Sequence, residues 1–310
     1  MDFVKIPCIY FPTSVIMIDD NMSFLENIRM TINDYSTVSL FSDPEKAFYS
    51  LNLNSALENI NVLGKIDEDE IDIDNAFSID YTKLSSYFNV NNDTSVVVID
   101  YSMPEMNGVD FCKKIKSMKA KKIMLTGEAD TEVAVDAFNR GLISKFIIKN
   151  SSNIQEILNQ SINELKIQYF LDSRINELVS SFAKIKENEF YIKLASAWIK
   201  LNNIVRYYQT DNFGSLAGLD EKNQTSYLHI LSEEKFQEYQ EIAKQQGGAD
   251  NLISQLLGRK KIPVFLSPKS KELDINQWDL ILHKIQGFFQ SDKQTYYYCS
   301  GFSYSYEAEH

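Results

Sequence analysis

Cysteine is scarce in this chain, and long apolar runs are missing. The three cysteines among 310 residues, Cys8, Cys112 and Cys299, form no CxxC pair. An odd number of cysteines without such a pair predicts neither a disulfide framework nor a zinc site. No window holds the run of about eighteen apolar residues that a membrane span requires, and the first residues lack the layout of a signal peptide. We therefore expect a cytoplasmic protein that is not inserted into a membrane.

A basic stripe, the usual footprint of a nucleic-acid-binding surface, is also missing. The formal net charge is −12, and residues 189–310 hold thirteen basic and fifteen acidic residues. The cluster Arg259-Lys260-Lys261 follows an apolar stretch and indicates a solvated helix end. No helix-turn-helix with a basic recognition helix, no G-x-G-x-x-G and no P-loop motif is present. DNA is therefore not expected as a partner.

Short apolar runs rich in β-branched residues alternate with helical patterns in the first half of the chain. Such runs are typical of parallel strands that are covered on both faces. Their alternation with helices predicts a doubly wound α/β fold around a five-stranded parallel sheet. The expected strands are 14–18, 37–41, 95–99, 122–125 and 146–148, and expected helices begin near residues 24, 44, 108 and 131.

Candidate site residues with a charged or hydroxyl side chain follow four of these five runs. Asp19 and Asp20 follow the first run, Asp100 the third, Thr126 the fourth and Lys149 the fifth. Taken alone, an acidic pair is a common helix cap, and a single threonine or lysine is an ordinary turn or surface residue. In a doubly wound sheet, however, ligands bind outside the carboxyl ends of the strands. The shared position therefore predicts one site at this edge of the sheet.

From residue 13 to about residue 165, the chain resembles the receiver domain of two-component response regulators. Besides the acidic pair, the resemblance rests on the stretch Ser102-Met103-Pro104-Glu105-Met106-Asn107-Gly108 that follows Asp100. It also rests on the Thr-Gly-Glu-Ala turn that Thr126 opens, and on Phe146 three residues before Lys149. The resemblance implies that the predicted sheet is flavodoxin-like.

The same resemblance implies phosphoryl transfer that depends on magnesium. A carboxylate attacks a phosphoryl donor poorly unless charge repulsion is removed, and Mg²⁺ suits a site of oxygen ligands. By the resemblance, Asp100 accepts the phosphoryl group, and Lys149 and Thr126 bind its oxygens. The implied metal ligands are Asp19, Asp20, Asp100 and the backbone carbonyl of Ser102.

A conformational switch is implied as well. The Thr126 hydroxyl would move to meet a phosphoryl oxygen, and Phe146 would change rotamer into the space behind it. Ser102 and Glu128 occupy the positions that tune how quickly the phosphorylated aspartate is hydrolysed. The only catalysis expected is therefore the phosphorylation and dephosphorylation of Asp100 by the chain itself.

The chain departs from the family pattern at three places. Asn150 stands where the family usually has a proline, and Ser102 stands two positions after the phosphoacceptor. The third departure is an insertion at about residues 54–93, which contains nine acidic residues and two lysines. Its acidic run 67–74 lacks the central glycine and the final glutamate of a calcium-binding EF-hand loop. A solvated flap or an extended second helix is expected there, with partner recognition as a use.

In the second half of the chain, the sequence pattern predicts a helical connector at 166–208 and a small α+β domain at 209–310. Apolar residues recur at helical spacing from Ile154 to Ile185 and predict that the last receiver helix continues as one long amphipathic helix. That helix would either pack against the chain's own second domain or form a dimer. Further elements are expected as a hairpin within 213–231, helices at 233–245, 250–257 and 277–289, and strands at 263–266 and 295–302.

The leading interpretation is a response regulator. It would take a phosphoryl group from a sensor histidine kinase or a phosphotransfer protein and switch a C-terminal interaction module, through dimerisation of the chain. One alternative is a transcription regulator with an unrecognised DNA-binding domain. Others are a pseudo-receiver adaptor that is not phosphorylated, and an output enzyme acting on a nucleotide or phosphate, for which no catalytic constellation is visible.

Overall fold

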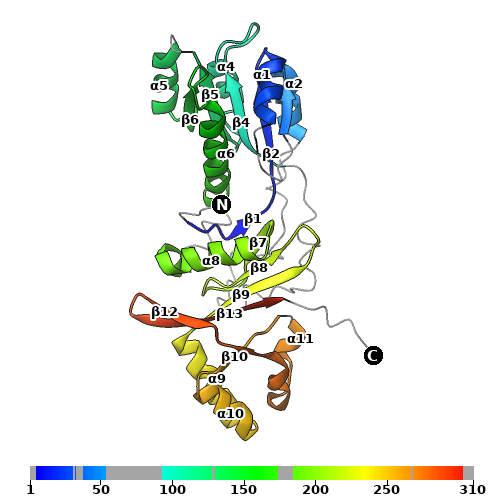
Figure 1. The fold of residues 1–310 in the computed structure, drawn as a ribbon, viewed down its shortest axis with the longest axis vertical. Helices are drawn as coiled ribbons and strands as arrows, with labels where there is room; N and C mark the ends of the chain where they lie inside the picture. Colours follow the sequence, from blue (N-terminus) through cyan, green and yellow to red (C-terminus); the bar gives the residue numbers. More distant parts are fainter. Residues whose placement is uncertain are drawn as a thin grey trace. The chain divides into compact units, whose positions relative to one another are not determined.

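The computed structural model describes residues 5–30, 32, 38–53, 93–127, 130–173, 184–266 and 268–302. These residues form two compact units (Figure 1). The first unit, here called the receiver unit, is built from described residues between Pro12 and Ser173. The second, here called the C-terminal unit, takes residues 5–11 together with the described residues after Ser173. Nearly all of the predicted insertion at 54–93 lies outside the described residues.

The receiver unit contains the predicted five-stranded parallel sheet. The order of its strands is β3-β2-β4-β5-β6, and each neighbouring pair is parallel. In chain order this is 2-1-3-4-5, the strand order of flavodoxin-like folds, so the predicted fold class is confirmed. The strands are β2 (Ser14–Ile18), β3 (Val38–Phe41), β4 (Thr94–Asp100), β5 (Lys121–Thr126) and β6 (Lys145–Ile148).

Helices cover both faces of this sheet, as the continuous apolar strands require. Alternate residues of β2 enter different cores: Val15 packs with residues of α1 and α6, whereas Ile16 packs with residues of α2, α4 and α5. Because successive side chains of a strand point to opposite faces, this split assigns each helix to one face. The helices are α1 (Met22–Arg29), α2 (Pro44–Leu53), α4 (Gly108–Lys114), α5 (Thr131–Asn139) and α6 (Ile154–Leu171).

The sequence predicts that the last receiver helix continues to residue 185. This prediction is wrong, because α6 ends at Leu171. The Asp172 backbone N–H bonds to the Gln168 and Phe170 carbonyls, and the Ser173 hydroxyl donates to the Phe170 carbonyl at 2.7 Å. A serine hydroxyl that donates to a backbone carbonyl competes with the backbone hydrogen bonds that would continue the helix. The residues between 174 and 183 lie outside the described part of the chain.

The C-terminal unit is built on a six-stranded antiparallel sheet in the order β1-β7-β8-β9-β13-β12. A separate ribbon joins β10 and β11. The sheet strands are β1 (Ile9–Tyr10), β7 (Arg206–Gln209), β8 (Leu216–Leu219), β9 (Thr225–Ser232), β12 (Gly287–Ser291) and β13 (Gln294–Phe302). The ribbon strands are β10 (Lys261–Pro263) and β11 (Leu282–Lys284). The helices are α8 (Glu189–Leu201), α9 (Glu233–Gln245), α10 (Asp250–Leu257) and α11 (Pro268–Lys271), with short 3₁₀ turns η4 (Lys184–Glu187) and η5 (Ile275–Ile281).

The hairpin, α9, α10 and the last strand of this unit match the sequence expectations, but the helix predicted at 277–289 is wrong. Only η5 is helical there, with a capping box formed by Asp274 and Gln277, and the chain then becomes extended at Leu282. Pairing of β11 with β10 and of β12 with β13 overrides the local helical spacing. The short strand expected at 263–266 lies earlier, at Lys261–Pro263.

Three further features bear on the sequence analysis. The three cysteines are buried free thiols, as expected. In the part of the chain that the structure describes, no helix is both long and apolar enough to span a membrane. The pairing of β1 with β7 joins the beginning of the chain to the C-terminal unit, which the sequence analysis did not foresee.

Candidate functional site

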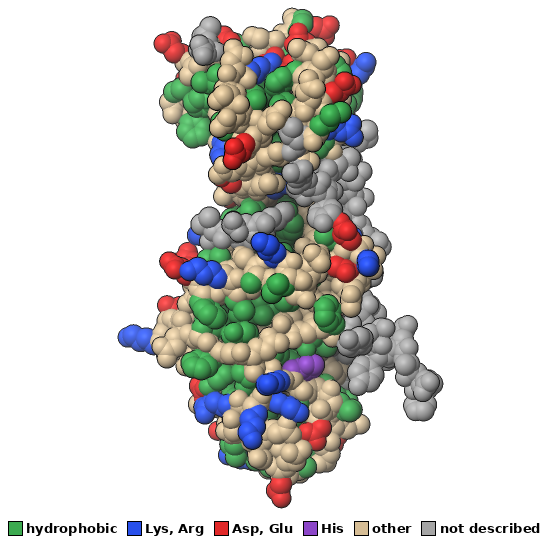
Figure 2. Space-filling model, in the orientation of Figure 1, with side chains coloured by type: hydrophobic (Ala, Val, Ile, Leu, Met, Phe, Trp, Pro, Cys, Tyr) green, Lys and Arg blue, Asp and Glu red, His purple; other side chains and the backbone are tan. Residues whose placement is uncertain are grey.

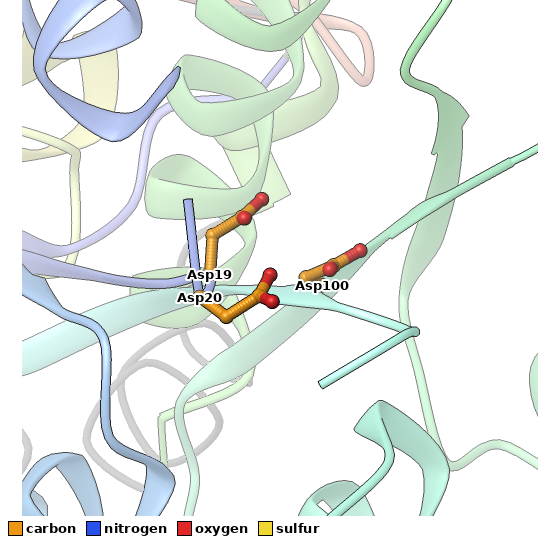
Figure 3. A group of neighbouring side chains, drawn as sticks. All are labelled: Asp19, Asp20 and Asp100. Carbon is orange, nitrogen blue, oxygen red and sulfur yellow. The ribbon is translucent and has the colours of Figure 1, made fainter. Parts of the chain in front are cut away.

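Three carboxylates meet at the carboxyl edge of the receiver sheet. Asp19 and Asp20 follow β2, and Asp100 is the last residue of β4, which pairs directly with β2. One carboxylate oxygen from each of the three lies within 4.8 Å of the others. Figure 3 shows Asp19 and Asp20 extending from the same short segment toward the end of the strand that carries Asp100. The sequence prediction of an acidic cluster at this edge therefore agrees with the geometry.

Lys149 enters the same cluster from the end of β6. Its ammonium lies 2.7 Å from Asp19 Oδ2 and 2.9 Å from Asp100 Oδ1. The Lys149 backbone N–H donates to the Thr126 carbonyl, which ties the end of β6 to the end of β5. Burial lowers the pKa of Lys149, but its hydrogen bonds to Asp100 and Asp19 raise this pKa by more. The ammonium therefore stays charged between two carboxylates.

Asp19 is the fully buried member of the cluster. Its Oδ1 atom accepts the Asn21 backbone N–H at 2.9 Å, and its own N–H donates to the Phe41 carbonyl of β3. Burial raises the pKa of Asp19, and the lowering contributions of Lys149 and of the Asn21 N–H do not cancel that rise. By contrast, Asp20 is exposed at the mouth of the cluster.

Two residues that the sequence analysis did not assign to the site contact its members. The Phe24 ring lies under the Lys149 ammonium, with 5.1 Å between the nitrogen and the ring centroid. Gly108 opens α4 so close to the Asp100 carbonyl that a Cβ atom there would meet the carbonyl oxygen at 2.5 Å. Gly108 belongs to the stretch on which the resemblance rested, whereas no sequence signal placed Phe24 beside Lys149.

The remaining predicted residues lie around this cluster. Thr126 is fully buried at the end of β5, and its hydroxyl donates to the Gly127 carbonyl at 3.1 Å. Phe146 of β6 is half-buried and meets Phe138 of α5 edge to face, with ring centroids 6.4 Å apart. Ser102 is exposed in the loop between β4 and α4. Glu128 lies outside the described residues.

The donor set of the cluster fits a hard divalent cation. All three converging side chains are carboxylates, and oxygen ligands are what Mg²⁺ prefers. Three ionised carboxylates beside one lysine leave two uncompensated negative charges, which a divalent ion would balance. The residues that would hold such an ion are Asp19, Asp20 and Asp100.

Comparison with known proteins agrees with this geometry. The family model described as the response regulator receiver domain matches residues 80–161. Over 63 residues the chain is 38% identical to the chemotaxis protein CheY1 of Helicobacter pylori, a match that covers 19% of this chain and 50% of that protein. A chemotaxis protein CheY homolog of Campylobacter jejuni is 33% identical over 63 residues, covering 19% and 48%. The chain thus spans about half the length of the curated relatives it matches.

One solved structure is similar over almost the whole chain. The structure of the Legionella pneumophila response regulator LqsR aligns with a TM-score of 0.77 and 28% identity, and the alignment covers 98% of this chain and 91% of that one. The likeness therefore extends through the C-terminal unit. Together with the flavodoxin-like strand order and the acidic edge of the sheet, these matches identify the receiver unit as a response regulator receiver domain.

Proposed function

We propose that the receiver unit accepts a phosphoryl group on Asp100 from a sensor histidine kinase or a phosphotransfer protein. One observation carries the proposal: Asp100 lies in one cluster with two further carboxylates and the ammonium of Lys149. In the proposed step an Asp100 carboxylate oxygen bonds to phosphorus while the P–N bond of a phosphohistidine breaks. The imidazole then leaves with the electron pair of that bond.

The proposed step depends on charge compensation in this cluster. When bound, Mg²⁺ would neutralise the carboxylates and stabilise the phosphoryl oxygens. We assign its binding to Asp19, Asp20, Asp100 and the Ser102 carbonyl. Lys149 lies 2.9 Å from Asp100 Oδ1, within reach of an oxygen on the phosphoryl group that Asp100 would carry. Its raised pKa keeps it in the cationic form that this contact needs.

Thr126 and Phe146 are the proposed switch. The Thr126 hydroxyl donates to the Gly127 carbonyl at 3.1 Å. A neutral hydrogen bond of this kind contributes only about 1 kcal/mol, so a phosphoryl oxygen can compete for the hydroxyl. Phe146 contacts half-exposed Phe138, so a rotamer change of Phe146 would alter the surface of α5. We retain Ser102 and Glu128 as the residues that tune hydrolysis.

The proposed output of the switch is an interaction module in the C-terminal unit, acting through dimerisation of the chain. The nearly equal numbers of basic and acidic residues in 189–310 support a protein partner over a nucleic acid. A cytoplasmic location remains part of this proposal. Light scattering before and after phosphorylation tests dimerisation, and an unchanged molar mass would remove it from the proposal.

One observation favours a second candidate output, DNA binding. Lys261 and Lys284 are cross-strand partners in the β10–β11 ribbon, and like charges opposite each other are unfavourable without an anion. Figure 2 shows basic side chains gathered near a histidine on this unit. Salt-dependent retention of the full chain on duplex DNA, lost in a Lys261→Glu, Lys284→Glu double variant, would establish this output. Equal retention of both proteins, or none, would exclude it.

The experiment that tests phosphoryl transfer is intact-protein mass spectrometry after incubation with acetyl phosphate, with and without Mg²⁺. We expect a gain of one phosphoryl group that requires Mg²⁺. Asp100→Asn is nearly isosteric and should fold normally, yet it should gain nothing. Uptake that persists in this variant would overturn the assignment of Asp100, and no uptake by the native chain would leave a pseudo-receiver adaptor as the function.

A further inference from the structure

The Lys149 ammonium has a third neighbour besides its two carboxylates. Its nitrogen lies 5.1 Å from the centroid of the Phe24 ring, which is the range of a cation–π contact. The same nitrogen lies 2.7 Å from Asp19 Oδ2 and 2.9 Å from Asp100 Oδ1. The lysine side chain is 24% exposed, so its ammonium is partly withdrawn from water. Partial desolvation strengthens the attraction of a cation to an aromatic face.

The Phe24 ring is held in place from its own helix. Asn21 caps α1, and its side-chain oxygen accepts the Phe24 backbone N–H at 3.0 Å. The backbone N–H of Asn21 also bonds to Asp19, so the cap and the acidic cluster share one short segment. The ring packs against the core cluster that contains Leu25 and Ile28 of the same helix. The backbone of Phe24 is therefore anchored by the cap, and its side chain contacts both this core cluster and the Lys149 ammonium.

Phosphorylation would change the two kinds of contact differently. Once Asp100 carries an acyl phosphate, its Oδ1 no longer bears the carboxylate charge that now attracts Lys149. Of the two carboxylates that now contact the ammonium, only Asp19 would then keep its carboxylate charge. The contact with Phe24 involves no atom of Asp100, so the transfer leaves it unchanged. The ring therefore offers the same contact while the charge beside the ammonium moves from a carboxylate to a phosphoryl group.

We propose that Phe24 is a positioning residue for phosphoryl transfer, which holds the Lys149 ammonium in the acidic cluster through its ring face. This proposal rests on the proposed function of the receiver unit. Phe24 does not touch the reacting atoms and acts only through Lys149. Loss of one cation–π contact should slow phosphoryl uptake about three- to thirtyfold, the range expected for partly to well desolvated pairs.

The test compares Phe24→Leu and Phe24→Tyr with the native full-length chain. The rate constant of Mg²⁺-dependent uptake from acetyl phosphate is measured by intact mass at saturating donor. Phe24→Leu keeps an apolar side chain but removes the ring and should slow uptake, whereas Phe24→Tyr keeps the ring and should retain the native rate. The matched control is Phe48→Leu, which removes another lysine–phenylalanine contact in the same unit, where Lys114 lies 4.2 Å from the ring centroid. That variant should retain the native rate.

A second readout reports the contact directly. In NMR spectra, the ring current of Phe24 should shift the Lys149 methylene protons next to the ammonium, and this shift should disappear in Phe24→Leu and persist in Phe24→Tyr. Native uptake by Phe24→Leu, or equal slowing in Phe24→Tyr and Phe48→Leu, would overturn the positioning role. If the native chain takes up no phosphoryl group, the proposed function fails, and a missing ring-current shift would show separately that Phe24 does not hold Lys149.

Discussion

Gly108 packs directly on the backbone of the phosphoacceptor candidate Asp100. A Cβ atom at Gly108 would lie 2.5 Å from the Asp100 carbonyl oxygen and 3.0 Å from Tyr101 Cα. The Gly108 N–H donates to the Tyr101 carbonyl at 2.9 Å, so the first turn of α4 is fastened to the end of β4. The position of the Asp100 carboxylate therefore depends on a glycine, which has no side chain, at position 108.

Gly108→Ala should displace the end of β4. The neighbouring atoms are backbone and cannot rotate away, so we expect a loss of about 1 to 3 kcal/mol in the stability of the receiver unit. Hydrogen exchange should quicken at Asp100 and Tyr101, and phosphoryl uptake should fall. Gly127→Ala is the matched control, because a Cβ there would meet its nearest atom, Asp130 Oδ2, at an ordinary 3.5 Å. Equal effects of the two substitutions would contradict this account.

The receiver sheet was predictable because each of its strands carries a strong local signal. The run Val96-Val97-Val98-Ile99 is apolar at every position, as a strand buried on both faces must be. Once the strands are known, the doubly wound rule brings their carboxyl ends together and predicts that Asp19, Asp100 and Lys149 meet. The contact of Phe24 with Lys149 was not predictable in this way, because it depends on the rotation and tilt of α1 against the end of β6.

The C-terminal unit was less predictable because its pairings are non-local. Ile9 and Tyr10 form a strand only through Tyr208 and Tyr207, nearly two hundred residues later. Around Gly287 the spacing of apolar residues suggests a helix, yet a Cβ at this glycine would lie 2.5 Å from the Tyr298 hydroxyl oxygen. Cross-strand packing of this kind decides between strand and helix, and local spacing does not contain it.

The contact between Phe138 and Phe146 should contribute little to stability. Phe138 is 47% exposed, and an aromatic pair adds about 1 kcal/mol beyond the area it buries. Phe138→Leu should therefore cost about 1 kcal/mol or less and leave phosphoryl uptake unchanged, while the Phe146 ring gains freedom. NMR relaxation of a labelled Phe146 ring measures that freedom. A ring that stays as rigid as in the native chain would show that other neighbours hold it.

His229 should make the C-terminal unit sensitive to acid. Burial, with a smaller contribution from His283, lowers the pKa of His229 to about 4, and its Nε2 atom is enclosed without a hydrogen-bond partner among the described residues. The unfolded chain binds a proton at this residue near pH 6.5, so stability should fall as the pH drops from about 6.5 to about 4. The full loss is up to about 3 kcal/mol.

Thermal unfolding of native and His229→Gln chains across this pH range measures the effect. Carboxylates also titrate in the lower part of the range, so the quantity to compare is the difference between the two proteins at each pH. We expect the melting temperature of the variant to depend less on pH than that of the native chain. If the melting temperatures of the two proteins changed in parallel with pH, proton binding by His229 would not differ between the folded and unfolded states, and the prediction would be wrong.

Gln286 protects the part of β13 that β12 does not cover. Its side-chain amide donates to the Ser300 carbonyl at 3.0 Å and accepts the Ser300 N–H at 3.1 Å, as a neighbouring strand would. Gln286→Ala would leave both backbone groups to water, and we expect a loss of about 1 to 2 kcal/mol, since each neutral hydrogen bond contributes about 1 kcal/mol. The Ser300 amide should exchange faster, while the middle of β13 stays protected by β9.

The matched control for this last change is Gln290→Ala on the neighbouring edge strand. Gln290 is exposed, and its backbone carbonyl accepts from the Asn188 side chain at 2.9 Å. Because alanine keeps that carbonyl, Gln290→Ala should leave both the stability and the exchange of Ser300 unchanged. If hydrogen exchange of the Ser300 amide became equally faster in both variants, the whole edge of the sheet would be fraying. The Gln286 side chain would then not be what protects this amide.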